Sequence, residues 1–226
     1  PKLVKELGQT AVAITDHGVM YGAIDFYRAC KAQGIHPVIG CEVYVARRTR
    51  LDKTYELDAE SRHLVLLCEN NQGYKNLCKL VSEAFLHGFY SKPRIDLELL
   101  EQYHEGLIAL SACLGGAIPQ ALLAEDYEGA KAYALRMSRM FGPERFYLEL
   151  QDHGIDKQRP VNQGLQRLAR ETGLPLVITN DAHYLRKEDA DIQDVLLCIQ
   201  TGKTVDEINR MRFETQEFYL KSEQEL

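Results

Sequence analysis

The sequence has no apolar run of membrane length and no pair of cysteines at CxxC spacing. A membrane helix needs roughly 18 or more consecutive apolar residues, and no stretch of the chain approaches that length. The six cysteines occur singly, which argues against a zinc finger and against a disulfide framework. We therefore expect free thiols in the reducing environment of a cytoplasm.

An excess of positive charge is also absent. Lysine and arginine number 27 against 33 acidic residues, so the net charge is −6 and the pI is near 5.7. A domain that grips duplex DNA by its phosphates is usually basic. Arg47, Arg48 and Arg50 form a small basic run, for which a solvated loop is a better explanation than a phosphate contact. If nucleic acid is the substrate, neighbouring domains or bound metal must supply much of the attraction.

The length of 226 residues suits a single domain, and we expect one that spans residues 1–226. No internal repeat or low-complexity linker divides the chain. The first residue is proline instead of methionine, which suggests a fragment or a processed product.

Short apolar strands alternate with helices along the whole chain. Strands are predicted at 11–15, 37–46, 63–68, 106–111, 145–150 and 175–179, and the chain ends in an extended segment at 213–220. Helices are predicted at 2–7, 21–33, 73–87, 161–172 and 190–200, most of them closing on a glycine. This order favours an α/β fold of parallel βαβ units. A closed (β/α) barrel needs about eight strands in roughly 250 residues. The chain is close to this size but is short by at least one βα unit.

Histidines, carboxylates and a cysteine fall at or near the ends of these strands. They are Asp16 and His17, Glu42, His63, Cys113, Asp152 and His153, and Asp181 and His183. Barrels and open parallel sheets place their active sites at the carboxyl ends of strands. Imidazole and thiolate suit zinc, and carboxylates often bridge two metals. Together these residues favour a metal site.

Each residue has a plainer interpretation when it is taken alone. Asp16 and His17 are typical of a turn, and Asp181 suits a helix N-cap as well as it suits a metal. Cys113 is typical of a small buried residue, and His63 of a core histidine. Their coincidence at one end of the strands favours an unspecified metal or polar site. No chemistry is assigned to the remaining histidines, which are His36, His87 and His104.

Several stretches closely resemble a known family, in the same order along the chain. They are ITDHGVMYG at 14–22, GIHPVIGCEVY at 34–44, RHLVLL at 62–67, LSACLG at 110–115 and TNDAHY at 179–184. The family is the polymerase-and-histidinol-phosphatase (PHP) domain of bacterial DNA polymerase III alpha subunits. The ending FYLKSEQEL at 218–226 resembles the place where that domain leads into the polymerase core. Each motif is modest alone, but the ordered set is very specific.

The resemblance implies a distorted (β/α)7-type PHP barrel with a cluster of divalent metals in its mouth. Zinc is the first expectation, and manganese or iron are the alternatives. Asp16 is implied as an orienting residue behind the ligands, and His153 is carried over only weakly. Residues 211–226 are expected to begin the connection to the polymerase core. The implied metal ligands are His17, Glu42, His63, Cys113, Asp181 and His183.

One departure from the family concerns the first residues of the chain. The family begins with a strand bearing His-x-His, followed by a further acidic ligand, and this chain starts downstream of both. The resemblance therefore implies a barrel that is incomplete at its N-terminal strand, with open edges beside 11–15 and 175–179. We expect reduced metal occupancy, and a seam that is frayed or covered by another copy.

The resemblance implies a parent protein that is a DNA-directed DNA polymerase of DNA replication, located in the cytoplasm. Within it, this domain would hydrolyse phosphodiester bonds at a DNA 3′ end, as a 3′–5′ proofreading exonuclease. The alternative is a non-catalytic module that supports the polymerase and docks a separate proofreading subunit. A third alternative is a free-standing phosphatase similar to histidinol-phosphate phosphatase, and the polymerase-like ending argues against it.

Overall fold

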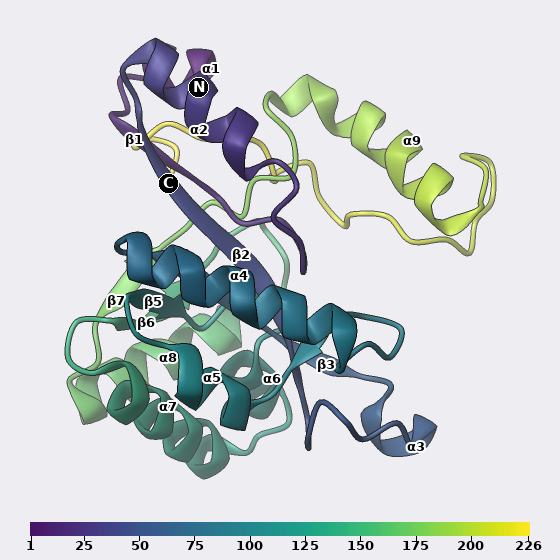
Figure 1. The fold of residues 1–226 in the computed structure, drawn as a ribbon. Coiled ribbons are helices and arrows are strands. Elements are labelled where there is room, and N and C mark those ends of the chain that lie inside the picture. The colour runs from purple at the N-terminus through teal and green to yellow at the C-terminus, as the bar shows by residue number, and fades with distance from the viewer.

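Figure 1 shows the computed structural model, which describes all residues from 1 to 226. Its centre is a curled seven-stranded sheet, and the α/β class is therefore confirmed. The strands lie in the order β1 (Ala11–Ile14), β2 (His36–Ala46), β3 (Ser61–Cys68), β5 (Leu107–Leu110), β6 (Phe146–Leu150) and β7 (Leu176–Ile178), with β4 (Arg94–Ile95) paired to β2. β1 and β7 are the two open edges of the sheet, as predicted.

The direction of one strand differs from the prediction. β1 is parallel to β2, and β5, β6 and β7 are parallel to one another, but β3 runs antiparallel to both β2 and β5. The prediction of parallel βαβ units throughout was wrong. Residues 47–60 between β2 and β3 hold only the short helix α3 (Tyr55–Asp58), so the chain reverses without a crossover helix. Buried apolar runs suit central strands of either direction, and the sequence pattern could not distinguish them.

The five predicted helices are present, with slightly different ends. They are α1 (Lys2–Glu6), α2 (Ala23–Gln33), α4 (Asn71–Leu86), α8 (Gln158–Thr172) and α9 (Ala190–Thr201). The sequence pattern did not predict α3, α5 (Leu97–Tyr103), α6 (Ala117–Leu123), α7 (Tyr127–Phe141), the 3₁₀ turn η1 (Lys187–Asp189) or strand β4. α7 buries Ala130 and Ala134 beside Met137 and Phe141, so half of its buried face is alanine and only weakly apolar in sequence. The signal that was available is Asp126, whose side chain caps α7 by accepting from the Gly129 N–H at 2.9 Å.

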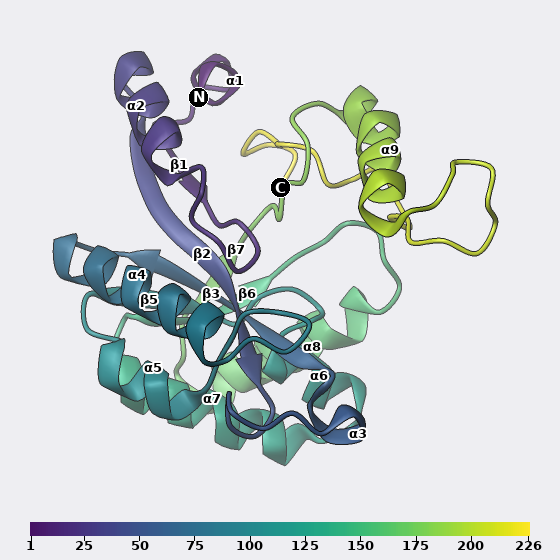
Figure 2. The same cartoon turned by 45° about the vertical axis from the view of Figure 1, so that its right-hand side comes forward.

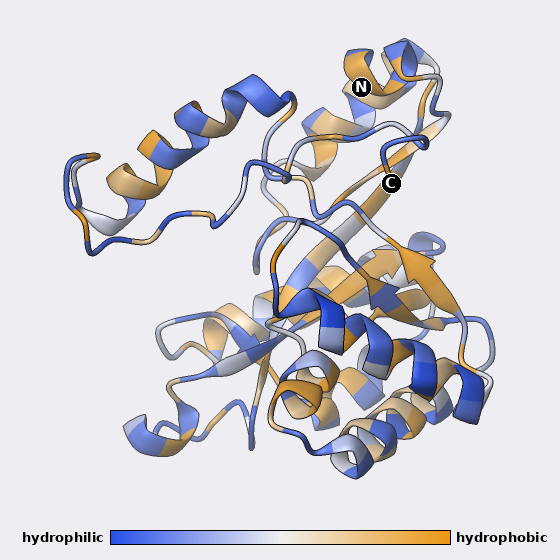
Figure 3. Ribbon diagram, turned by 180° about the vertical axis from the view of Figure 1, so that it is seen from behind, coloured by the Kyte–Doolittle hydropathy of each residue, from blue (hydrophilic) through white to orange (hydrophobic).

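The two faces of the sheet differ because successive side chains of a strand point to opposite sides. One face packs against helices α4 to α8 and forms the main core, to which Val43, Leu64 and Leu148 contribute. Figure 3 shows the hydrophobic colouring of the strands and the hydrophilic outer turns of the helices that cover them. The opposite face carries Glu42 and His63, which alternate with these core residues along β2 and β3. Polar side chains on that face are therefore free to face one another.

A second, smaller part of the molecule lies at the far end of β2. There Val4, Cys30 and Ile35 form a separate small core of α1, α2 and the start of β2. The long strand β2 runs from this part into the main body, and α9 stands apart from the sheet (Figures 1 and 2). None of the helices combines the length and the apolar character needed to cross a bilayer.

Candidate metal centre

Backbone pairing brings His17 beside Glu42. The chain that follows β1 stays next to β2, because the Glu42 N–H donates to the Asp16 carbonyl at 3.0 Å. The Gly18 N–H in turn donates to the Glu42 carbonyl at 2.9 Å, and His17 and Glu42 form an isolated parallel bridge. Main-chain hydrogen bonds thus place two residues from separate motifs side by side.

His63 reaches the same place from β3. In the antiparallel register Val65 lies opposite Glu42, so His63 and Glu42 occupy the same face of the sheet. The His63 N–H donates to the Gly115 carbonyl at 3.0 Å, which holds the loop of Cys113 over the start of β3. A Cβ at Gly115 would lie 2.9 Å from Nδ1 of His63, so this close approach requires glycine.

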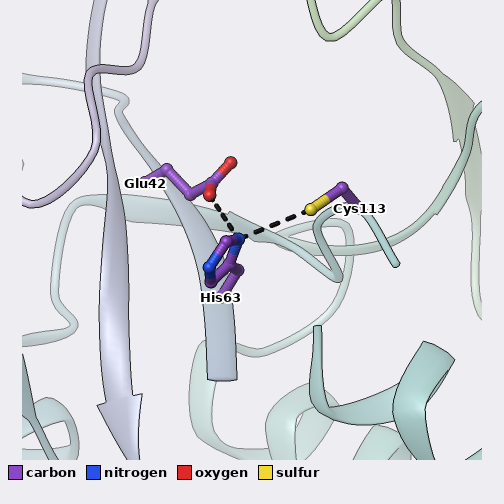
Figure 4. A group of neighbouring side chains, drawn as sticks. All are labelled: Glu42, His63 and Cys113. Atoms are coloured by element: carbon purple, nitrogen blue, oxygen red, sulfur yellow. Dashed lines mark hydrogen bonds and ion pairs between the residues drawn. The ribbon is translucent and has the colours of Figure 1, made fainter. Parts of the chain in front are cut away.

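Glu42, His63 and Cys113 point toward one another (Figure 4). Oε1 of Glu42 lies 2.6 Å from Nδ1 of His63, and Sγ of Cys113 lies 3.4 Å from the same nitrogen. All three potential ligand atoms lie within 4.8 Å of one another, close enough to share a cation. Nδ1 of His17 approaches the same Oε1 of Glu42 at 3.0 Å, which adds a fourth donor.

Asp181 and His183 join this group next to His17. The rings of His17 and His183 lie 5.7 Å apart between centroids, and Nε2 of His183 is 3.4 Å from Oδ1 of Asp181. The His183 N–H donates to the Phe218 carbonyl at 2.8 Å, so the final segment of the chain holds this turn. The structure therefore brings all six proposed ligands around one site, and the metal role of each stays a prediction.

The electrostatics of the site centre on Glu42, which is buried. Burial by itself would raise the pKa of Glu42, but hydrogen bonds from His17 and His63 outweigh it and lower the pKa to about 2. The same hydrogen bond raises the pKa of His17. Burial raises the pKa of the Cys113 thiol. The site thus holds an ionised carboxylate between two imidazoles, beside a protonated thiol.

A divalent metal fits this set of side chains. Imidazole, thiolate and carboxylate are the side chains that bind zinc, and a cation would bind their deprotonated forms. A metal also deprotonates a coordinating thiol outright, which offsets the raised pKa of Cys113. The structure therefore contains a candidate metal site.

His153, included as a weak candidate, does not belong to this group. Its ring is buried and stacks on Phe218 with centroids 4.1 Å apart. Nε2 donates to the Asn180 carbonyl at 2.7 Å, and Nδ1 accepts from the Gln158 amide at 2.8 Å. Both ring nitrogens are committed to hydrogen bonds, and burial lowers the pKa of His153. In this structure His153 is thus a buried, hydrogen-bonded residue outside the group of six, and its role as a weak ligand candidate stays a prediction.

Asp16 acts through its backbone in this structure. Its side chain is exposed, and no hydrogen bond joins its carboxylate to His17. Its carbonyl instead accepts from the Glu42 N–H and, at 3.2 Å, from the Cys41 thiol. Main-chain pairing through Asp16 therefore positions Glu42 beside His17, and the orienting role of the Asp16 carboxylate stays a prediction.

Glu149, a buried carboxyl residue on β6, was not predicted from the sequence. Its carboxyl group accepts from the Ala112 N–H at 2.9 Å, from the Gln151 amide at 3.1 Å and from the Thr179 hydroxyl. Burial raises the pKa of Glu149 to about 7. The signal in the sequence was an acidic residue inside the apolar strand Phe146–Leu150, a placement that is costly without partners.

Lys92 was also missed, and it lies at the rim of the site. Its ammonium sits over the Tyr44 ring, 5.3 Å from the centroid, and that ring meets His63 edge-on at 5.4 Å. A Cβ at Gly18 would lie 2.9 Å from both Pro93 and Tyr44, so the His17 turn packs tightly against this rim. Lys92 thereby brings an exposed positive charge close to an acidic site.

Comparisons with known proteins agree with the resemblance. Among curated proteins, DNA polymerase III subunit alpha of Borreliella burgdorferi is 48% identical over 223 residues, covering 98% of this chain and 19% of that protein. DNA polymerase III subunit alpha of Treponema pallidum is 46% identical over 226 residues, covering 100% of this chain and 19% of that protein. The subunit of the same name in Thermus aquaticus is 47% identical over 218 residues, covering 96% of this chain and 18% of that protein. The chain spans about a fifth of the length of these relatives.

Among solved structures, a candidate metal-dependent phosphoesterase from Bifidobacterium adolescentis matches with a TM-score of 0.48 and 14% sequence identity, over 80% of this chain and 79% of that chain. A family model described as the PHP domain matches residues 1–153, which include His17, Glu42, His63 and Cys113. Because this match covers well over half of the chain, the chain belongs to the PHP domain family.

Proposed function

We propose that this chain is the PHP domain of a bacterial DNA polymerase III alpha subunit and that its site hydrolyses phosphoester bonds with divalent metals. The proposed reaction is removal of nucleotides from a DNA 3′ end, as a 3′–5′ exonuclease. The observation that carries the proposal is that the buried Glu42 and five other side chains of metal-binding type, from distant parts of the sequence, meet at one place. Relatives named DNA polymerase III subunit alpha align over nearly the whole chain.

The proposed ligands fall into two neighbouring groups. Glu42, His63 and Cys113 form the compact group, and Asp181 and His183 form the other, with His17 between them. When bound, divalent metal supplies an acidified water as nucleophile and stabilises charge on the phosphoryl oxygens. Glu42 stays ionised across the physiological pH range and can balance the charge of cations on either side.

The charge of the chain favours a small contact with the substrate. With a net charge of −6, the domain lacks the excess of positive charge that is usual in proteins that grip duplex DNA by its phosphates. The bound metal and Lys92, over Tyr44 at the rim, are the groups that we propose attract a single phosphodiester. A free 3′ end presents such a target, whereas the middle of a duplex does not.

The proposal is tested by substituting His63. We expect the protein to release nucleotides from a 3′-labelled single-stranded DNA in the presence of Mn²⁺ or Zn²⁺, and His63→Ala to lower that rate about 100-fold or more, because the substitution removes a metal ligand. His87→Ala is the matched control, since His87 is an exposed histidine that contacts only Glu83 on its own helix. Equal rates for the wild type and His63→Ala would exclude this site as the source of the activity.

A second candidate function is that of a structural and docking module. The observation in its favour is that the final segment packs against the site, since the rings of Phe213 and Phe218 lie 4.8 and 5.6 Å from His183. Bound metal would then stiffen the connection to the polymerase core, with a proofreading subunit as a partner. Tight metal binding without any release of nucleotides, in the same assay, would favour this function. For either function we propose a cytoplasmic protein that works on DNA with the rest of the polymerase.

A further inference from the structure

We propose that Glu149 is a positioning residue, which holds the Cys113 turn and the Asp181 segment in the geometry that metal binding requires. This inference rests on the proposed metal site but adds a residue that hydrogen-bonds to none of the proposed ligands. Glu149 lies on β6, between β5, which leads to Cys113, and β7, which leads to Asp181 and His183. It therefore sits between two ligand-bearing segments that share no direct strand pairing with each other.

The contacts of Glu149 reach both neighbours. Toward β5, Oε2 accepts from the Ala112 N–H at 2.9 Å, and the backbone N–H of Glu149 donates to the Ser111 hydroxyl at 2.8 Å. Toward β7, Oε1 accepts from the Thr179 hydroxyl. Ala112 immediately precedes Cys113, and Thr179 precedes Asp181 by two residues. One carboxyl group thus joins the two turns that carry three of the proposed ligands.

The backbone conformation of these turns indicates that they need such support. Ala112 has φ of +65° and Asp181 has φ of +45°, a region that residues with a side chain rarely adopt. Conformations of this kind cost roughly 1–3 kcal/mol each and persist only where the surrounding structure holds them. The hydrogen bond from the Ala112 N–H to Glu149 is made by the left-handed residue itself. The carboxyl group is therefore placed to hold a turn that would otherwise relax.

The partners of Glu149 also argue against a purely electrostatic or a purely packing role. Its carboxyl group has no cation within reach, and its three partners are an amide N–H, a hydroxyl and a side-chain amide. An apolar residue at this buried position would avoid the cost of desolvating a carboxyl group. What an apolar side chain could not do is accept hydrogen bonds from both flanking segments at once.

The test measures zinc binding by the metal-free protein with calorimetry, in the wild type and in two variants. Glu149→Gln keeps the size of the side chain but presents an amide N–H₂ to one of its donors. Thr179→Val keeps the carboxyl group of Glu149 and removes only the hydroxyl that donates to it. We expect affinity about 10–100-fold weaker for Glu149→Gln and several-fold weaker for Thr179→Val, the range that is typical of residues that orient metal ligands. Glu171→Gln, on an exposed ion pair between α7 and α8, is the control.

Urea unfolding of the metal-free forms accompanies the titrations, because a merely structural role would lower stability without changing the affinity of the folded protein. Zinc affinity within twofold of the wild type for folded Glu149→Gln would overturn the inference. Weaker binding by Glu149→Gln with unchanged binding by Thr179→Val would also overturn it, since the hydrogen-bonded link to the Asp181 segment would then not matter. If Glu149→Gln does not fold, Thr179→Val decides alone. Absence of zinc binding by the wild type would instead contradict the proposed metal site.

Discussion

Glu42 shows how one residue acquires its properties from distant parts of the chain. Its carboxylate is buried, which would favour the neutral form, yet histidines from two other segments keep the pKa near 2. A carboxylate that stays ionised in a buried place suits a metal ligand. His153 differs, because both of its ring nitrogens form hydrogen bonds within the protein, to Asn180 and to Gln158.

We predict that His153→Ala weakens the fold without weakening metal binding. The substitution removes a buried ring that stacks on Phe218 and bonds to Asn180, so the free energy of unfolding should fall by about 2–4 kcal/mol. Zinc affinity of the folded variant should stay within about threefold of the wild type, an energy difference of under 1 kcal/mol. Denaturant unfolding and calorimetry measure the two quantities. A loss of affinity comparable with that of His63→Ala would show that His153 is a ligand after all.

Among the elements, the strands place the chemistry and the helices support them. Alternation along β2 and β3 sends core residues to the helix-covered face and the site residues to the other. Helices α7 and α8 pack on the outer side of β5 and β6 and are joined at their surface by Glu171, which accepts from Lys131 and Arg167 at 2.8 Å each. These ion pairs are exposed, so their contribution to stability is small.

The ion pairs of Glu171 between α7 and α8 predict that the stability of the protein depends on pH in a defined way. Hydrogen bonds from Lys131 and Arg167 lower the pKa of Glu171 to about 2, from an ordinary value of 4.5. Because the folded-state pKa is depressed, the contribution to stability is present above the ordinary pKa and is lost as the pH falls through the folded value. Glu171→Gln should therefore be slightly less stable than the wild type at pH 7, with the difference shrinking from about pH 4.5 downward. Urea unfolding across that range measures it, and a difference independent of pH would refute the assignment.

For the molecule as a whole, the open edges of the sheet are the dominant feature. β1 and β7 each have a single neighbour in the sheet, and on β7 the side chains of Leu176 and Ile178 are 40% and 59% exposed. Unpaired edges of this kind invite pairing with another strand. β3 lies between β2 and β5 at the centre of the sheet, none of its residues is exposed, and Leu64, Val65 and Leu66 are buried.

We predict that amide hydrogen exchange follows this arrangement. Amides of β3 should exchange only through global unfolding, whereas those of β1 and β7 should exchange at least about 10-fold faster through local opening. Mass spectrometry or NMR of the metal-free protein at low concentration measures the rates. If the amides of β1 and β7 exchange more slowly as the protein concentration rises, a second copy of the chain covers these edges. Equal protection of all strands in the dilute protein would contradict an open sheet.

The sequence by itself determined where most strands begin and end and which ligand types follow them. Apolar runs such as Leu64–Leu67 and glycines such as Gly34 and Gly173 act locally, so they can be recognised without the fold. The chemical character of His17, Cys113 and His183 is likewise a property of the residues. Only the tertiary structure decided that β3 runs antiparallel and that Glu149 lies between two ligand-bearing turns. It also decided that both ring nitrogens of His153 form hydrogen bonds within the protein. The physical reason is that these facts depend on contacts between residues far apart in sequence, which no local pattern encodes.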